Sequence, residues 1–560
     1  MAENTSASGK RPGLLTLLLI VGLAAVAVRA VFFVEFLHDL PYYRSTHRGT
    51  DMHTYRLWAE RVGEGDLLSR HRGPFYYTPL YAYALGGVYA LSGTDGVVPG
   101  MVLNALFGVA AALCAAGLAR RLFGWWAGLT GGLLMALNGS QICVEGVTLV
   151  DGLLPALLLG ALWLVVELLD RDASPAWWLA PGGLLGLATV GRGSNLLVAA
   201  ALGVLLLVGL GRRRGWGRSA AACLLLAVGF ALPLVPPVLR NGLMHGRWTV
   251  TTNGPVMLYI GNRPGAPGVL YTPGDLSRQA ARERSDGYWM GRLADELRED
   301  AWSLPATMWR KVQLFFNAWD VPGNLNYHFV RRYVTSLRLL TVGPLVLYVL
   351  GFVGLTVTAL RWRRLVPLYV FGGSFALSII LVLVDGRYKL PFLGLLAVFA
   401  GAGLVTLAGR LRRGEWEVPF LSVVLAGLLT LLFWPRGPTP FLDRNCPLRA
   451  NEYRVNAMAL IRAERDEDAE DMLDDASLLF PADARFAVLC AKLHLQDGEA
   501  REALTVLERP LERGIFDEEA MELRVHTYRE LGREEDMRRA ARELLHRHPG
   551  NQTARRALGR

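Results

Sequence analysis

The sequence of 560 residues contains 52% hydrophobic and 19% charged residues, with 61 glycines and five cysteines. Soluble globular proteins carry about 25% charged residues, and disordered chains carry more charge with few aromatic residues. The composition therefore excludes a disordered chain, a collagen-like chain and a disulfide-stapled scaffold, and it indicates a protein that lies mostly in a membrane. The net charge of +10 does not indicate nucleic-acid binding, because the arginines cluster between apolar segments, where they predict membrane topology.

Eleven apolar segments have about the length needed to cross a bilayer as helices, which is roughly 20 residues. They are 13–37, 98–118, 122–139, 143–169, 176–191, 194–211, 219–239, 337–360, 365–384, 388–409 and 418–434. The first segment is too long for a cleaved signal peptide and lacks the small-residue cleavage site. We therefore expect an all-α, polytopic membrane protein with about eleven spans and its two termini on opposite sides.

Basic residues in alternate gaps predict the orientation, because cytoplasmic loops are enriched in lysine and arginine. These gaps contain Lys10 and Arg11, Arg120 and Arg121, Arg171, Arg212–Arg214 with Arg218, Arg361 with Arg363 and Arg364, and Arg410 with Arg412 and Arg413. Two long segments, 38–97 and 240–336, then lie outside, together with the chain from 437 onward. Long structured loops on one face predict that the chemistry takes place there, whereas carriers place their polar groups in mid-membrane.

From about residue 450 the sequence becomes charged and helical, with a 34-residue period typical of tetratricopeptide repeats. In frames that start at Ala450, Ala484 and Glu518, equal phases contain Gly498 and Gly532, Ala469 and Ala503, and Pro481 and Pro549. Small residues at fixed phases let paired helices pack closely. We expect a transmembrane domain at 1–436 and a helical repeat domain at 450–560 that binds a protein partner; a generic helical-hairpin domain is the alternative.

The first external loop contains the residue types that chemistry at this face would need. It reads RGTDMHTYRLWAE over 48–60 and PFYYTPLYAY over 74–83. Asp51 opens an amphipathic stretch and is a candidate general base. An equally good interpretation is that Asp51 caps this helix, with Thr50 as the competing cap. The aromatic string is likewise either part of a site or an interfacial belt.

These motifs together resemble the GT-C glycosyltransferases, in particular bacterial members of the protein-mannosyltransferase and aminoarabinose-transferase type (glycosyltransferase family 39). The resemblance extends over 13–410 and rests on four motifs in the same order. They are the first loop with Asp51, the segment 191–195 with Arg192, the segments 240–241 and 253–268, and the string Arg-Tyr-Lys-Leu-Pro at 387–391. Many relatives have paired acids in the first loop, whereas here Met52 follows Asp51.

The resemblance implies an enzyme of the bacterial inner membrane that transfers a sugar from a polyprenyl-phosphate donor to an acceptor hydroxyl on the outer face, with inversion. It implies Asp51 as the base and a second acid in the next external turn, for which Glu145 and Asp151 are alternatives. The candidates for binding the substrate are Arg387 and Lys389, then Arg192 and Arg240, with Tyr55, Tyr81 and Asn262. Membrane lipids are further partners, and the acceptor is not indicated.

No metal-ligand set is predicted, because His53, His245 and His328 lack the spacing of a designed site, although a divalent ion at His53 stays open. No other cofactor is predicted. Two other functions also stay open. A ligase that joins lipid-linked glycans would use acids of 240–336, such as Glu296, Glu299 and Asp320. A non-enzymatic transporter or assembly scaffold would show similarity between two halves of the chain, which the sequence lacks.

Overall fold

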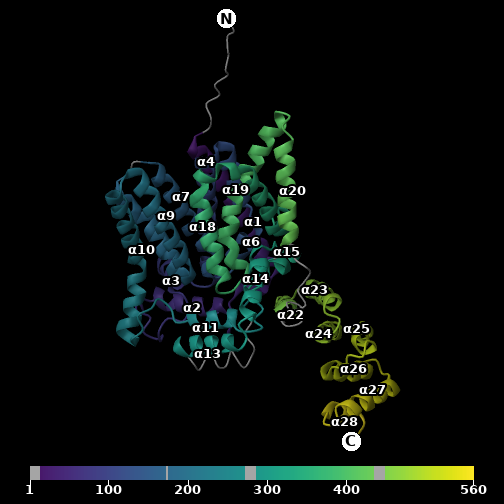
Figure 1. Cartoon of the computed structure of the whole chain (residues 1–560). Helices are drawn as coiled ribbons and strands as arrows, with labels where there is room; N and C mark the ends of the chain where they lie inside the picture. The colour runs from purple at the N-terminus through teal and green to yellow at the C-terminus, as the bar shows by residue number, and fades with distance from the viewer. Residues whose placement is uncertain (1–12, 172–173, 271–285, 319, 434–447, 560) are drawn as a thin grey trace. The chain divides into compact units, whose positions relative to one another are not determined.

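The computed structural model describes residues 13–171, 174–270, 286–318, 320–433 and 448–559, so the predicted N-terminal anchors Lys10 and Arg11 lie outside the described residues. Within these ranges the chain folds into helices, and its only β-type pairings are two isolated bridges. The predicted all-α fold class is therefore confirmed. The chain divides into two compact units, Met1–Phe36 with Ser45–Phe441, and Leu37–Arg44 with Leu442–Arg560 (Figure 1).

The first unit is built from long apolar helices. In the described part of the chain, seven helical segments are long and apolar enough to cross a membrane. They are Leu14–Asp39 (α1), Val97–Phe123 (α4), Val150–Asp170 (with α7, Leu154–Asp170), Gly193–Arg212 (with α9, Leu196–Arg214), Trp216–His245 (α10), Pro344–Ile380 (α17, Pro344–Thr358, and α18, Trp362–Ile380) and Gly386–Arg412 (with α19, Leu390–Arg412). The chain is a multi-pass membrane protein.

Three other predicted spans are shorter helices, namely Trp125–Ala136 (α5), Leu179–Gly191 (α8) and Glu417–Leu432 (α20). The prediction of one continuous span over 143–169 is wrong. Helix α6 (Gly139–Glu145) ends before Gly146, and α7 begins only at Leu154. Glycine at 146 and 152 weakens a helix, whereas Pro155 favours the first turn of a new one. Glu145 and Asp151 therefore lie on opposite sides of a helix break.

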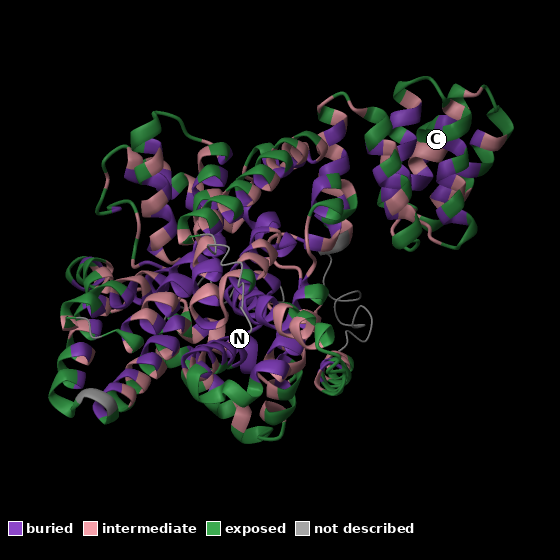
Figure 2. Ribbon diagram, turned by 90° about the horizontal axis from the view of Figure 1, so that it is seen from above, coloured by how far each residue is buried: buried purple, intermediate pink, exposed green. Residues whose placement is uncertain are grey.

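Close packing at glycines holds the centre of this unit together. A Cβ at Gly354 in α17 would lie 1.9 Å from the carbonyl oxygen of Phe399 in α19, and one at Gly403 would lie 2.8 Å from the Cα of Gly354. Small residues at such positions let helix backbones approach in a membrane, where van der Waals packing drives association. Figure 2 shows buried residues gathered in the interior of the bundle and exposed residues on its outer helices.

The loops of this unit separate to the two ends of the bundle. At one end, Arg121 pairs with Glu167 at 3.4 Å and Asp170 at 3.1 Å, and Arg364 donates to the backbone carbonyl of Arg121 at 3.3 Å. Three of the predicted basic gaps therefore meet. The short helices of the two long loops lie at the other end (Figure 1). They are Asp51–Gly63 (α2), Pro79–Ser92 (α3), Gly254–Asn262 (α11), Asp286–Glu299 (α13) and Ser303–Phe316 (α14).

The second unit contains three helix pairs and a final short helix. The pairs are α22 (Leu448–Arg462) with α23 (Asp466–Leu479), α24 (Arg485–Gln496) with α25 (Ala500–Glu512), and α26 (Glu518–Glu530) with α27 (Glu534–Arg547), followed by α28 (Gln552–Ala557). The second helix of each pair begins 34 residues after the previous one. Glu464, Gly498 and Gly532 precede these helices with φ of 56°, 80° and 69°. The left-handed turn thus repeats at one phase, and glycine adopts it without strain.

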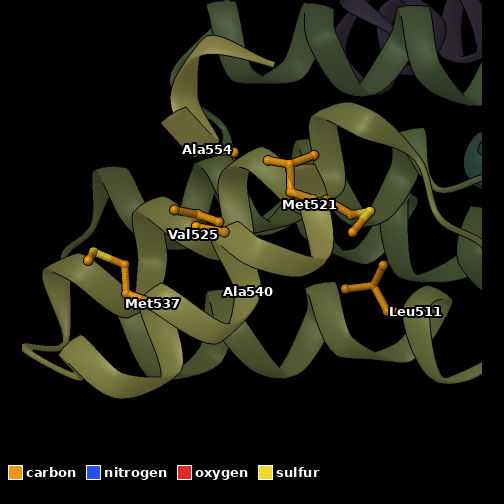
Figure 3. Packing of buried hydrophobic residues seen from close by; sticks show 8 residues of the cluster. Leu511, Met521, Val525, Met537, Ala540 and Ala554 are labelled. Carbon is orange, nitrogen blue, oxygen red and sulfur yellow. The ribbon is translucent and has the colours of Figure 1, made fainter. Parts of the chain in front are cut away.

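The last repeat and the end of α25 enclose a core of buried residues. Leu511, Met521, Val525, Met537 and Ala540 belong to this cluster, and Figure 3 shows their side chains between the helices. The short helix η1 (Pro41–Arg44) also belongs to the second unit, where it packs against α22. The assignment of these pairs to the tetratricopeptide class stays a prediction.

Candidate active site

Helix α2 presents Asp51 at its first turn without using it as a cap. The side chain of Thr50 accepts from the backbone N–H of His53 at 3.2 Å, so Thr50 is the N-cap. The capping alternative for Asp51 is therefore wrong. Its carboxylate stays available for other contacts, and it lies where the partial positive charge of a helix N-terminus stabilises a negative group.

Arg387 lies between three carboxylates that come from distant parts of the sequence. Its Nη2 is 3.5 Å from Asp51 Oδ2, its Nη1 is 3.5 Å from Asp151 Oδ2, and its Nε is 3.5 Å from Asp385 Oδ2. The side chain of Arg387 is 8% exposed and that of Asp151 is 2% exposed, whereas that of Asp51 is 27% exposed. Of the three carboxylates around Arg387, Asp51 is therefore the one that a substrate can reach.

A second arginine completes the cationic part of the cluster. Arg192 pairs with Asp151 through Nη2, and its guanidinium carbon lies 3.5 Å from the ring centroid of Tyr388. Arg387 contacts the same ring at 5.3 Å. Cations held against an aromatic face in this way are strongly oriented. Arg192 and Arg387 therefore both contact the ring of Tyr388 and both pair with Asp151, so the two guanidinium groups lie close together.

Asp385 caps the short helix that contains Arg387. Its side chain accepts from the backbone N–H of Arg387 at 3.1 Å and caps the short helix η6 (Gly386–Lys389). Burial raises the pKa of Asp385 to about 6, against the opposing effect of Arg387. Asp385 is therefore a local support for the arginine.

Two tyrosines and an asparagine interact with Asp51. Asn324 donates from Nδ2 to Asp51 Oδ2 at 2.5 Å, and the hydroxyls of Tyr55 and Thr78 are 2.9 Å apart. Burial raises the pKa of Tyr55 and of Tyr77 above the usual range, and the charge of Asp51 adds to both. Both hydroxyls therefore stay protonated at neutral pH and can donate hydrogen bonds to a substrate.

Glu145, the alternative second acid, is used elsewhere. It accepts from Arg29 Nε at 2.6 Å, from Arg29 Nη2 at 2.9 Å and from Gln141 Nε2 at 2.8 Å, and both partners of the ion pair are nearly inaccessible. Removing either partner of such a buried pair would leave an uncompensated charge, so Glu145 is committed to Arg29. The structure brings Asp151, and not Glu145, next to Asp51.

Two predicted phosphate-binding cations contact the backbone instead. Lys389 donates to the carbonyl of Asn317 at 2.9 Å and to that of Leu314 at 3.4 Å. Arg240 donates to four carbonyls of the first loop at 2.7–3.0 Å, which are those of Leu68, Ser69, Arg72 and Gly73. Both residues donate to backbone carbonyls of the two long loops and lie outside the Arg387 cluster.

The remaining predicted substrate-binding residues, Asn262 and Tyr81, are buried. Asn262 donates to the carbonyls of Leu258 and Leu381 at 2.9 and 3.0 Å. The ring of Tyr81 is fully buried and packs edge-on against Tyr55, with centroids 5.5 Å apart. Of the acids that a ligase would use, Glu296 accepts from Tyr259 at 2.8 Å and Asp320 accepts from Ser140 at 2.8 Å. Neither of these two acids contacts Arg387.

Sequence reasoning missed four residues of the cluster, namely Asp385, Tyr388, Tyr77 and Asn324. Tyr388 lies within the string at 387–391, and Asp385 lies two residues before its arginine. Both positions could therefore have been predicted from the motif. Tyr77 lies in the aromatic string. Asn324 carried no signal, because only the fold of the 240–336 loop brings it to Asp51.

Residues 76–240 match the family described as dolichyl-phosphate-mannose-protein mannosyltransferase. The matched segment contains Asp151 and Arg192, whereas Asp51 and Arg387 lie outside it. The resemblance to GT-C glycosyltransferases is thereby confirmed for this segment. No curated protein sequence matches the chain.

Among solved structures, the chain is similar to ArnT from Cupriavidus metallidurans in the apo state, with 16% identity and a TM-score of 0.45 over 94% of this chain and 80% of that one. It is also similar to the same protein bound to undecaprenyl phosphate, with 16% identity and a TM-score of 0.43 over 96% and 80%. A third match is the oligosaccharyltransferase AglB from Archaeoglobus fulgidus in complex with an inhibitory peptide and a dolichol-phosphate, with 13% identity and a TM-score of 0.41 over 79% of this chain. The chain spans 59% of the length of AglB.

Proposed function

We propose that the protein is a membrane glycosyltransferase that moves a sugar from a polyprenyl-phosphate donor to an acceptor hydroxyl, with Asp51 as the general base. The observation that carries the proposal is the accessible carboxylate of Asp51 beside two oriented arginines, Arg192 and Arg387. The family matched over 76–240 is described by a lipid-phosphate-linked donor, which supports the donor class.

The chemistry needs a base at the acceptor hydroxyl and cations at the leaving phosphate. Asp51 takes the proton of the acceptor hydroxyl while the hydroxyl oxygen forms its bond to the anomeric carbon. The bond from that carbon to the phosphate oxygen breaks, and the polyprenyl phosphate leaves with the electron pair. Arg192 and Arg387 stabilise the charge on this phosphate through charge-assisted hydrogen bonds.

A single displacement of this kind inverts the anomeric centre. Phosphate is a good leaving group and needs little help from an acid, so one base suffices. Asp151 then keeps both arginines in place, and Asn324 orients the carboxylate of Asp51 through its 2.5 Å hydrogen bond. Tyr55 and Tyr77 supply hydroxyl donors for the sugar.

The site faces the extracytoplasmic side of a bacterial inner membrane in this proposal. The Arg121 end of the bundle carries three basic gaps, and such gaps favour the cytoplasm. The loop end with Asp51 is then outside. Nucleotide sugars are not available there, which favours a lipid-linked donor.

The test is the variant Asp51→Asn with Asp95→Asn as its matched control, because Asp95 is an exposed acid of the same loop region. Release of undecaprenyl phosphate from its mannose and aminoarabinose conjugates is measured in proteoliposomes. We expect Asp51→Asn to lose about 10²–10⁴-fold in rate, the usual contribution of a general base. Equal membrane insertion of both variants excludes misfolding, and unchanged transfer by Asp51→Asn would exclude it as the base.

A further inference from the structure

Three side chains that commonly bind metal ions converge in the second unit, in the pair formed by α23 and α24. The ligand atoms of Glu470, Cys490 and His494 all lie within 4.8 Å of one another. Cys490 and His494 are one turn apart on α24 and thus share a face, whereas Glu470 comes from α23. The sequence predicts no metal site here, because the three residues approach each other only when the two helices pack.

The imidazole of His494 is held with one nitrogen directed at this group. Its Nδ1 is 2.9 Å from Glu499 Oε2, and its Nε2 is 3.2 Å from Glu470 Oε1. A carboxylate on one ring nitrogen fixes that nitrogen as the protonated one and leaves the other nitrogen as a ligand, as in the carboxylate–histidine–zinc arrangement. Glu499 therefore occupies the position of a supporting residue behind a metal-binding histidine.

The thiol of Cys490 is buried beside the other two ligand atoms. Its residue is 1% exposed, and its sulfur lies within 4.8 Å of a carboxylate oxygen of Glu470 and of a ring nitrogen of His494. A divalent ion binds cysteine as the thiolate, and the three donors therefore surround one position that an ion can occupy.

We propose that Glu470, Cys490 and His494 bind one divalent transition-metal ion, with Zn²⁺ as the best fit, and that Glu499 orients the histidine. Thiolate, imidazole and carboxylate together are the donor set that zinc prefers. Around a tetrahedral ion with bonds of about 2.0–2.3 Å, ligand atoms stand roughly 3.5 Å apart, so small movements complete the site. Glu470 can make them, because its side chain is 44% exposed. Water fills the fourth position, and the ion fastens α23 to α24.

The first experiment uses Co²⁺ as a spectroscopic probe on the purified full-length chain in detergent. We expect one Co²⁺ per chain with a thiolate-to-metal charge-transfer band, and displacement of that band by one equivalent of Zn²⁺. A titration without a thiolate band would overturn the proposal and leave His494 as a hydrogen-bonded link between two glutamates. Because this test uses the unaltered protein, its outcome does not depend on whether a variant folds.

Variants then assign the ligands. Cys490→Ser should abolish the band, and Glu499→Gln should weaken Zn²⁺ binding by about 10-fold or more, which is the typical effect of removing a carboxylate behind a histidine ligand. Two controls should leave binding unchanged. His526→Gln alters an exposed histidine that pairs with Glu530 at 3.8 Å without a cysteine, and Cys223→Ser removes a thiol of the other unit. Unchanged binding by Cys490→Ser would overturn the site.

Discussion

At the scale of single residues, Arg387 is the central group of the candidate site. It contacts Asp51, Asp151 and Asp385 at once, through three different nitrogens. A planar guanidinium can direct its donors to three acids, whereas the ammonium of a lysine is a point charge. The separation of Asp51 and Asp151 therefore rests on the shape of this side chain as well as on its charge.

We predict that Arg387→Lys loses about 100-fold or more in transfer rate, because one ammonium cannot both neutralise the carboxylates and hold the phosphate. Arg61→Lys is the control, because Arg61 is 64% exposed on α2 and pairs with the equally exposed Glu64 at 3.6 Å. The measurement is the initial transfer rate at saturating donor, with membrane insertion compared by quantitative blotting. A rate for Arg387→Lys equal to that of Arg61→Lys would contradict the role of the guanidinium.

Lys311 gives a prediction for the dependence of stability on pH. It is fully buried on α14 and donates to Asn262 Oδ1 at 2.7 Å and to the carbonyl of Val382 at 2.8 Å. Burial lowers its pKa to about 7. Between pH 7 and about 10 the folded protein therefore binds fewer protons at this residue than the unfolded protein does. Its contribution to stability is complete above about pH 10.4 and is lost as the pH falls through 7.

We expect the free energy of unfolding to rise with pH between 7 and 10, by up to about 1.4 kcal/mol per pH unit from this residue. In Lys311→Met that slope should disappear, while the overall stability falls because two acceptors lose their donor. Thermal unfolding in detergent at several pH values provides the comparison. Equal slopes in both proteins would show that the lysine is charged in the folded state throughout this range.

The sequence identifies the residue types of the candidate site better than it separates their roles. Asp51, Asp151, Arg192 and Arg387 converge in the structure, and each was a candidate. Lys389 carried the same signal as Arg387 but donates to the carbonyls of Leu314 and Asn317 at the C-terminal end of α14. Which carbonyls need a donor depends on tertiary structure, so pattern reasoning cannot distinguish a binding cation from a supporting one.

At the scale of elements, apolar length predicts where helices form, and glycine decides how closely they approach. The break between α6 and α7 shows the limit of the first rule. Hydropathy is continuous over 143–169, so the window contains no signal except Gly146, Gly152 and Pro155. The break turns the chain so that Asp151, in η2 (Val150–Gly152), reaches the arginines while Glu145 stays in the helix bundle.

Gly354 gives a prediction for the packing of α17 on α19. An alanine there would place its Cβ 1.9 Å from the carbonyl oxygen of Phe399, so the helices must separate. We expect Gly354→Ala to destabilise the protein by about 1–3 kcal/mol, as overpacking does. Gly373→Ala in α18 is the matched control, because nothing lies within 4 Å of its added Cβ and alanine favours the helix. Thermal unfolding should rank the control at or above wild type, and an unaffected Gly354→Ala would show that this contact is compliant.

At the scale of the whole molecule, the second unit includes a short piece of chain from the N-terminal part of the sequence. The segment Leu37–Arg44 groups with the second unit, where η1 packs against α22 and Arg465 donates to the carbonyl of His38. The same segment connects α1 with α2, and α2 begins with Asp51. The segment Leu37–Arg44 of the second unit therefore precedes the candidate base in the sequence.

Deletion of 450–560 tests what the second unit contributes. We predict that the truncated protein inserts in the membrane and keeps basal transfer to a small acceptor within roughly 10-fold, because Asp51, Asp151 and both arginines belong to the first unit. Its acceptor preference or its cellular position should change, since helical repeats present binding surfaces to partners. Arg465→Ala separates the two effects, because it removes one contact to the 37–44 segment and keeps the repeats. Complete loss of transfer in a well-inserted truncation, or in Arg465→Ala, would contradict this prediction.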